Sequence, residues 1–210
     1  MGLRESKKLA TRQQLADVAM RLFATRGFDH VTVAEVAAEA GVSEKTVFNY
    51  FPTKEDLFYD EVPERARTLV EAIRERPEGE SIVSTLRRLQ VAECARLSSP
   101  SFVVFARIIE DSPALQAKEL EVMAMFAQAV ADALVDEGID ARDARIAAGL
   151  LISVHRQFFR GARTQALAGK HGPAAARRLR GDLDRAFALL EHGLGGLVAH
   201  DHLKSVRSGS

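Results

Sequence analysis

The sequence predicts an all-α fold. Helix-forming residues, chiefly Ala, Leu, Glu and Arg, dominate the 210 residues, and no run alternates β-branched with polar residues as a half-buried strand would. Apolar side chains instead recur at spacings of three and four, which places them on one face of a helix. With 47% apolar and 28% charged residues, the chain can bury a core and stay soluble. We therefore expect one or two globular helical domains.

The first helix is expected over residues 9–26. Its buried face is defined by apolar residues three and four apart: Leu15, Val18, Ala19, Leu22 and Phe23. Gly27 is placed to end this helix in a left-handed conformation. Thr32 is a candidate N-cap for "VAEVAAEA", and Glu35 completes a capping box. This second, short helix is expected to stop at Gly41.

A third short helix is expected over residues 44–51. Ser43 is its candidate N-cap, and Pro52 disfavours helix in the residue before it. Thr53 then caps a fourth helix that opens "KEDLF", with acidic residues in the first turn where the helix dipole favours them.

The fourth helix is expected to continue past Pro63 with a kink or break, to about residue 76. The turn residues of "RPEGES" predict a linker after it. Proline and glycine then separate five more expected helices. These helices cover residues 81–97, 101–111, 114–137, 142–168 and 174–199.

Residues 33–51 have the pattern of a helix-turn-helix. Gly41 permits the tight turn in "AGVS", and Val42 is an apolar plug between the two helices. In such units the second helix enters the major groove of DNA. Val47 and Phe51 lie four apart and face the core, so the opposite face is free. Helical proteins that do not bind DNA also contain such turns, so the pattern alone leaves a purely structural role open.

The residues of the third helix suit contacts with base edges. Lys45 can donate to guanine O6 and N7 or to a phosphate, Glu44 can accept from cytosine N4, and Phe48 can lie against a thymine methyl. The alternative is a core Phe48 and a solvated Lys45. The other side chains expected at the groove are Ser43, Thr46 and Asn49. The natural phosphate partners are Thr32, Thr46, Tyr50 and Lys54.

Residues 15–58 resemble the TetR family of bacterial transcriptional regulators. The resemblance is carried by "LF…GF" at the end of the first helix, by "TV…VA..AGVS" in the second helix and turn, and by "YFPTKEDLF". It implies an N-terminal helix-turn-helix DNA-binding domain followed by a helical bundle for effector binding and dimerisation. We expect the first domain over residues 1–53, with a basic N-terminal arm, and the second over residues 54–204.

By position, the resemblance implies a set of DNA contacts. These residues are Thr32, Glu44, Lys45, Thr46, Phe48, Asn49, Tyr50 and Lys54. Many family members have tyrosine where this chain has Phe48, so any contact made by that hydroxyl is lost here. The arm ahead of the motif adds candidates for phosphate or minor-groove contacts. These candidates are Arg4, Lys7, Lys8 and Arg12.

The C-terminal helix carries a continuous apolar stripe. Its members recur every three or four residues: Leu179, Leu183, Phe187, Leu190, Leu194 and Leu197. Because the family resemblance implies dimers joined by the last two long helices, we expect this stripe at a dimer interface. Packing within one chain is the alternative use of the same stripe.

The middle helices are expected to hold an effector cavity. The apolar candidates are Phe102, Phe105, Ile109, Met123, Phe126, Val130, Leu151, Phe158 and Phe159. Two polar residues embedded among them, Arg107 and His155, are further candidates. Each of these residues could instead be ordinary core, and Arg107 could pair with Glu110.

Other site types are not indicated. The sequence contains no glycine-rich phosphate loop, nucleophile elbow or paired-histidine zinc motif, so we expect no cofactor, no catalytic residues and no metal site. His200 and His202 flank an aspartate near the C-terminus and are expected to be solvated. The single Cys94 and the absence of a long apolar run predict a cytoplasmic protein with no membrane partner.

We therefore predict a homodimeric transcriptional repressor, not an enzyme, that binds a near-palindromic double-stranded DNA operator. A small, largely apolar effector would release it. The balance of 29 basic and 29 acidic residues means that DNA binding would depend on a local basic surface. One alternative is a helical carrier or enzyme without a DNA role. Another is an activator or global regulator that shares the DNA chemistry.

Overall fold

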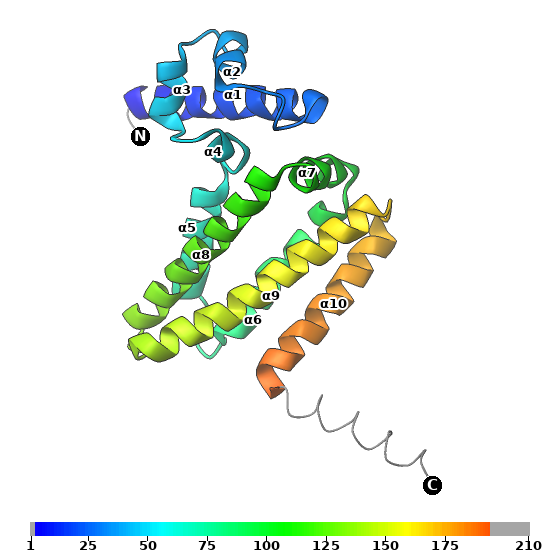
Figure 1. Cartoon of the computed structure of the whole chain (residues 1–210). Helices are drawn as coiled ribbons and strands as arrows, with labels where there is room; N and C mark the ends of the chain where they lie inside the picture. Colours follow the sequence, from blue (N-terminus) through cyan, green and yellow to red (C-terminus); the bar gives the residue numbers. More distant parts are fainter. Residues whose placement is uncertain (1–2, 194–210) are drawn as a thin grey trace. The chain divides into compact units, whose positions relative to one another are not determined.

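The computed structural model describes the backbone of residues 3–193 and the side chains from residue 5 onward (Figure 1). These residues form helices and connecting turns without a β-strand, so the predicted all-α class is confirmed. The helices are α1 (Leu3–Arg26), α2 (Val33–Glu39), α3 (Glu44–Tyr50), α4 (Lys54–Phe58), α5 (Val62–Arg74), α6 (Ile82–Glu93), a 3₁₀ turn η1 (Arg96–Ser98), α7 (Pro100–Glu110), α8 (Pro113–Asp136), α9 (Ala141–Leu167) and α10 (Pro173–His192).

Two boundaries differ from the sequence expectation. Helix α1 begins at Leu3, well before residue 9, because the preceding segment is made of good helix formers with Glu5 in the first turn. The basic arm is therefore the start of α1. The predicted break near Pro63 is confirmed, but it falls between α4 and α5, at residues 59–61. Pro63 is the second residue of α5, where its missing N–H leaves no helical hydrogen bond unmade.

The chain forms two compact units. The first unit contains residues 1–66 together with residues 103–122, and the second contains residues 67–102 together with residues 123–210. The boundaries fall inside α5, α7 and α8, so three helices pass from one unit into the other. The last eight residues of α7 and the first ten of α8 thus belong with the helix-turn-helix.

Aromatic side chains form much of the first unit's core. The ring of Phe23 lies 4.8 Å from that of Phe28, and Phe58 stacks on Phe105 with 4.6 Å between ring centroids. Phe23 is fully buried and Phe28 and Phe58 nearly so. Burying a side chain of this size contributes about 1.5–3 kcal/mol, so these rings are a large part of what stabilises the short helices around them.

The second unit packs long helices against one another. Helices α9 and α10 run antiparallel side by side, and α10 also contacts α6 (Figure 1). The buried face of α9 includes small residues such as Ala144, Ala148 and Ala162, which allow close helix approach. The facing side of α10 supplies Leu179, Leu183 and Phe187, each 1–2% exposed in the single chain.

Candidate nucleic-acid interface

The helix-turn-helix has the local structure that its sequence predicts. Thr32 Oγ1 accepts a hydrogen bond from the Glu35 amide at 3.2 Å, and the Thr32 amide donates to Glu35 Oε2 at 2.8 Å, which is the predicted capping box. Ser43 caps α3 in the same way, through the Thr46 amide. Gly41 has a φ of +71°, the left-handed conformation that the turn requires.

Helix α3 has one buried and one free face. Val47 and the following Phe51 are each 1% exposed and lie in the core of the first unit, as predicted. Glu44, Lys45 and Asn49 are exposed. Phe48, which the alternative placed in the core, is 47% exposed. An exposed phenylalanine between charged and amide side chains is unusual for a solvated face and suits an apolar contact with a partner.

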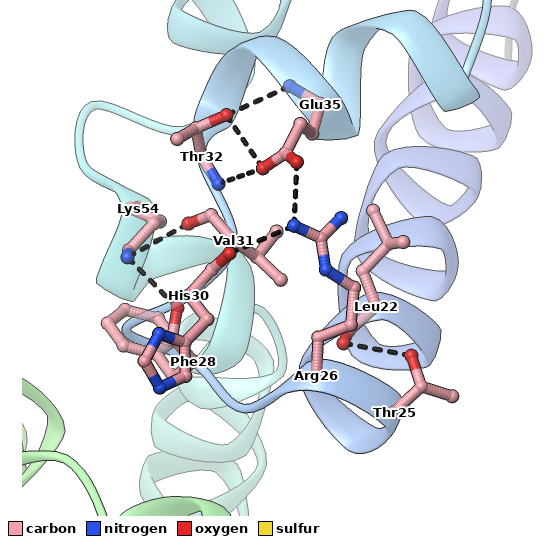
Figure 2. A network of polar contacts seen from close by, with 9 residues as sticks. All are labelled: Leu22, Thr25, Arg26, Phe28, His30, Val31, Thr32, Glu35 and Lys54. Atoms are coloured by element: carbon pink, nitrogen blue, oxygen red, sulfur yellow. Dashed lines mark hydrogen bonds and ion pairs between the residues drawn. The ribbon is translucent and has the colours of Figure 1, made fainter.

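Thr32 is also part of a network at the start of α2 (Figure 2). Its hydroxyl donates to Glu35 Oε2 at 2.9 Å, and Arg26 contacts Glu35 Oε1 at 2.6 Å and the His30 carbonyl at 3.0 Å. The hydrogen bond from the Thr32 amide, then that from Arg26, lowers the pKa of Glu35 to about 2. The Thr32 hydroxyl is therefore engaged in the cap, and its contact with phosphate remains a prediction.

Lys54 points into the same network. Its ammonium group donates to the carbonyls of Phe28 at 3.0 Å and Val31 at 3.1 Å, and it lies 4.1 Å from the centroid of the Phe28 ring (Figure 2). An ammonium group has three N–H donors, so one is left beyond the two carbonyls. The phosphate contact expected of Lys54 stays a prediction.

Arg12 is a contact that the sequence did not predict. It was grouped with the basic arm, but its guanidinium donates to the carbonyl of Tyr50 at 2.9 Å and to that of Asp60 at 3.1 Å. It also lies 4.2 Å from the centroid of the Phe51 ring. A signal was available in the spacing, because Arg12 is three residues before Leu15 and therefore near the buried face of α1.

The exposed lysines at the start of α1 lie beside the end of α3. Lys7, Lys8 and Tyr50, with Glu5 and Thr11, line an open hollow of about 440 Å³ on the first unit. This brings three of the predicted DNA contacts to one surface, which could follow a phosphate backbone. The side chain of Arg4, a fourth candidate, lies outside the described residues.

The predicted dimer stripe lies largely inside the second unit. Leu179, Leu183 and Phe187 are buried within a single chain, and Leu190 is half-buried. The first three pack intramolecularly, the alternative left open by the sequence, and a dimer role for them remains untested. Leu194 and Leu197 lie outside the described residues, as do His200 and His202.

The predicted effector contacts divide between the two units. In the first, Ile109 is buried and Phe105 stacks on Phe58, so both belong to the core around the helix-turn-helix. Arg107 was expected to be embedded among apolar residues, and this is wrong: its side chain is exposed. It lies on the outer side of α7, between inward-facing neighbours.

In the second unit an aromatic group surrounds a histidine. The half-buried His155 ring lies 5.7 Å from the centroid of Phe126 and 4.6 Å from that of Phe159, and Phe158 packs edge-on against Phe159. The remaining candidates of this unit are buried or half-buried: Phe102, Met123, Val130 and Leu151. Their contact with an effector is not tested by this arrangement.

Three buried side-chain atoms of the second unit lack a hydrogen-bond partner. They are Oε1 of Gln90, Oγ of Ser98 and Oε1 of Gln165. Two of them are close in the fold, because the turn after α9 donates the Lys170 amide to the Gln165 carbonyl and the Gly172 amide to the Ser98 carbonyl. The sequence analysis missed these residues, although a glutamine within the apolar run of α6 was a possible signal.

Within residues 3–193, no helix is both long and apolar enough to cross a membrane, and no three His, Cys, Asp or Glu side chains gather as metal ligands would. Cys94 is a buried free thiol, and burial raises its pKa.

Comparison with known proteins agrees with the geometry of the first unit. Residues 15–60 match the model of the family described as bacterial regulatory proteins, tetR family. The regulator TcmR of Streptomyces glaucescens is 28% identical over 154 residues, 68% of this chain and 67% of TcmR. The regulator LuxR of Vibrio harveyi is 52% identical over 54 residues, only 26% of each chain.

A solved structure shares the helical fold over most of the chain. FadR of Thermus thermophilus, a TetR family transcriptional repressor in complex with lauroyl-CoA, is 23% identical, with a TM-score of 0.53 over 87% of this chain and 94% of that one. At this identity the likeness speaks for the fold alone. Together with the matched motif and its exposed third helix, it identifies the chain as a member of the TetR family of bacterial transcriptional regulators.

Proposed function

We propose that the protein is a dimeric repressor that binds a near-palindromic operator and is released by a small effector. The observation that carries the DNA-binding part is the free face of α3, where Glu44, Lys45 and Phe48 are exposed while Val47 is buried. Donor, acceptor and apolar groups on one such face match the pattern of base edges in the major groove.

Specific and non-specific attraction come from different residues in this proposal. Lys45 contacts guanine or a phosphate, Glu44 accepts from cytosine, and Phe48 covers a thymine methyl. The residues proposed for the backbone or for supporting contacts are Ser43, Thr46, Asn49, Tyr50, Thr32, Lys54, Arg4, Lys7 and Lys8. Lys7 and Lys8 are supported by their place beside Tyr50 at the open hollow.

A dimer is supported by apolar residues left exposed on α9 and α10. Ile146 and Leu150, four apart on α9, are 58% and 55% exposed, and Leu189 of α10 is 38% exposed. We propose that these side chains, rather than the buried part of the leucine stripe, meet a second copy. Two-fold symmetry would place two recognition helices in half-sites about 34–36 Å apart, or slightly more.

The effector is proposed to bind in the second unit. FadR of Thermus thermophilus holds lauroyl-CoA, a ligand with a long apolar chain and polar groups. In this chain, the rings around His155 would contact the apolar part. The unpartnered atoms of Ser98 and Gln165 would supply hydrogen bonds to a polar end, which relieves the cost of leaving them buried without partners.

Release would follow from a change in the separation of the recognition helices. We propose that the effector shifts the segment of residues 53–76, through which the helix-turn-helix is joined to α5 and the second unit. A coupling free energy of about 1–3 kcal/mol would weaken operator binding by about 5- to 150-fold.

Selection from a random duplex pool tests the proposal. The purified chain is incubated with the pool at near-physiological salt, and the retained DNA is sequenced. One recovered near-palindrome would support a dimer that contacts specific bases, and Lys45→Ala should then relax the preference at one position in each half-site. A folded protein that retains no motif, or a single half-site without symmetry, would contradict the proposed repressor or its dimer.

A further inference from the structure

Two cations of the first unit that would be expected on the DNA surface are directed inward. Arg12 and Lys54 each donate to two backbone carbonyls and each lie close to an aromatic ring. Both side chains are half-buried. By contrast, Lys7, Lys8 and Lys45 are exposed. The basic residues of this unit thus fall into two groups that differ in what they contact.

Arg12 connects α1 with the C-terminal end of the recognition helix. Tyr50 is the last residue of α3, and Asp60 follows α4. Carbonyls at the end of a helix have no partner within it and carry the negative end of the helix dipole. The planar guanidinium satisfies both carbonyls at once and lies on Phe51, so it fixes the end of α3 relative to α1.

Lys54 connects the start of α4 with the turn between α1 and α2. Its two acceptors, the carbonyls of Phe28 and Val31, belong to the turn that leads into Thr32 and α2 (Figure 2). Arg26 holds the same turn through the His30 carbonyl. The position of α2, against which α3 is folded, therefore depends on Lys54.

We propose that Arg12 and Lys54 are positioning residues that determine base specificity by fixing α2 and α3, while the exposed lysines supply attraction to any DNA. This proposal rests on the proposed DNA-binding function. Hydrogen bonds to base edges weaken steeply when distance or angle changes, so a small shift of α3 costs specific contacts. Attraction to phosphates is long-range and tolerates such a shift.

The two roles have different signatures in binding measurements. Each phosphate that a cation neutralises adds about −0.9 to the slope of log K against log salt. Loss of a phosphate contact therefore makes the slope shallower and weakens binding to every sequence. Loss of a positioning residue lowers the ratio of specific to non-specific affinity and leaves the slope unchanged.

The experiment compares Arg12→Gln and Lys54→Met with the arm variants Lys7→Ala and Lys8→Ala, in the full chain. Lys170→Ala, in the turn between α9 and α10, is the neutral control. The probes are the duplex recovered by selection and a scrambled duplex of the same composition. Affinities are measured over a range of salt concentrations, well below the melting temperature of each variant.

We expect Arg12→Gln and Lys54→Met to lower the specific to non-specific ratio by roughly tenfold or more, with an unchanged salt slope. The arm variants should weaken both duplexes and make the slope shallower by about 0.9 each, with an unchanged ratio. The inference is wrong if Arg12→Gln and Lys54→Met behave like the arm variants, or if they lower stability and leave the ratio of the folded protein unchanged.

Arg12→Lys keeps the inference testable if Arg12→Gln does not fold. It retains the positive charge but cannot donate to both carbonyls in the same fixed geometry. A positioning role predicts that Arg12→Lys still loses the ratio, whereas a phosphate contact predicts near-complete rescue. Failure of the wild-type chain to prefer any duplex would be a different result, because it would overturn the proposed function itself.

Discussion

The two units hold their helices in different ways. In the first unit, α2, α3 and α4 have seven, seven and five residues, too few to be stable alone. Each begins with a side-chain cap, and the carbonyls of the turns and helix ends between them accept from Arg12, Arg26 and Lys54. In the second unit, long helices pack along their length, and several ion pairs, such as Arg87 with Asp184, lie on the surface.

The polar interiors differ as well. The buried Ser112 of the first unit donates to Asp29, and the half-buried Asp56 pairs with Lys118 at 3.1 Å. Burial opposes ionisation of Asp56, but hydrogen bonds from Thr53 and Lys118 outweigh it and lower the pKa of this carboxyl. The second unit instead leaves Gln90, Ser98 and Gln165 unpartnered. The first unit is thus specified by its own side chains, whereas the second has polar capacity that a ligand could use.

Removing an aromatic ring from the first unit should have the largest effect on stability. Phe23 is fully buried and contacts Phe28 and Phe58. Phe23→Ala should lower the free energy of unfolding by about 3–5 kcal/mol, measured by denaturant titration with circular dichroism. Leu9→Ala, at a position of α1 that is 54% exposed, is the control and should change it by less than about 0.5 kcal/mol. Similar small losses for both would mean that the rings do not carry this core.

The opposite sign is expected at the unpartnered glutamine of the second unit. Gln90→Met replaces a buried amide with an apolar chain of similar size and should leave stability unchanged or raise it by about 1–3 kcal/mol. Thr85→Val on the same helix is the control, because the buried Thr85 hydroxyl donates to the Ser81 carbonyl. It should cost about 0.5–1.5 kcal/mol. A loss at Gln90 as large as that at Thr85 would show that Gln90 has a structural partner.

A helix cap should matter more in the short helices than a hydroxyl within a long one. Ser43→Ala removes the cap of α3 and should cost about 1 kcal/mol of stability. Thr164→Ala in α9 removes a hydroxyl that donates to the Arg160 carbonyl within the same helix, and should change stability by less than about 0.5 kcal/mol. Thermal unfolding of the two variants compares them. Equal shifts would contradict the idea that local caps specify the first unit.

The sequence predicts the first unit well because its signals are local. The caps at Thr32, Ser43 and Thr53 depend on residues three positions apart, and the buried pair in α3 depends on a spacing of four. The inward direction of Arg12 and Lys54 could not be predicted, because it depends on carbonyls 38 and 48 residues from Arg12 and 26 and 23 from Lys54. A basic residue near a DNA-binding motif resembles a phosphate contact whichever way it points.

The second unit was harder to predict for the same reason. Its helices were expected with nearly correct ends, because proline, glycine and apolar spacing mark them. Which face of α10 is internal depends on α6 and α9, far away in sequence, so the leucine stripe indicated burial without its partner. The grouping of residues 103–122 with the helix-turn-helix likewise depends on long-range packing, and no local pattern predicts it.

The smallest expected effect concerns acid stability and tests the cap of α2. Because the pKa of Glu35 falls from 4.5 to about 2 on folding, its charged form stabilises the fold above pH 4.5, and this contribution is lost as pH falls from 4.5 to 2. Glu35→Gln should therefore lower stability at neutral pH and flatten the acid limb of a stability–pH curve in that window. Glu39→Gln, which removes a charge from the other end of α2, is the control. Identical curves for both variants would assign the effect to net charge; a flattened limb in Glu35→Gln alone would assign it to the bonds from Thr32 and Arg26 that fix the start of α2.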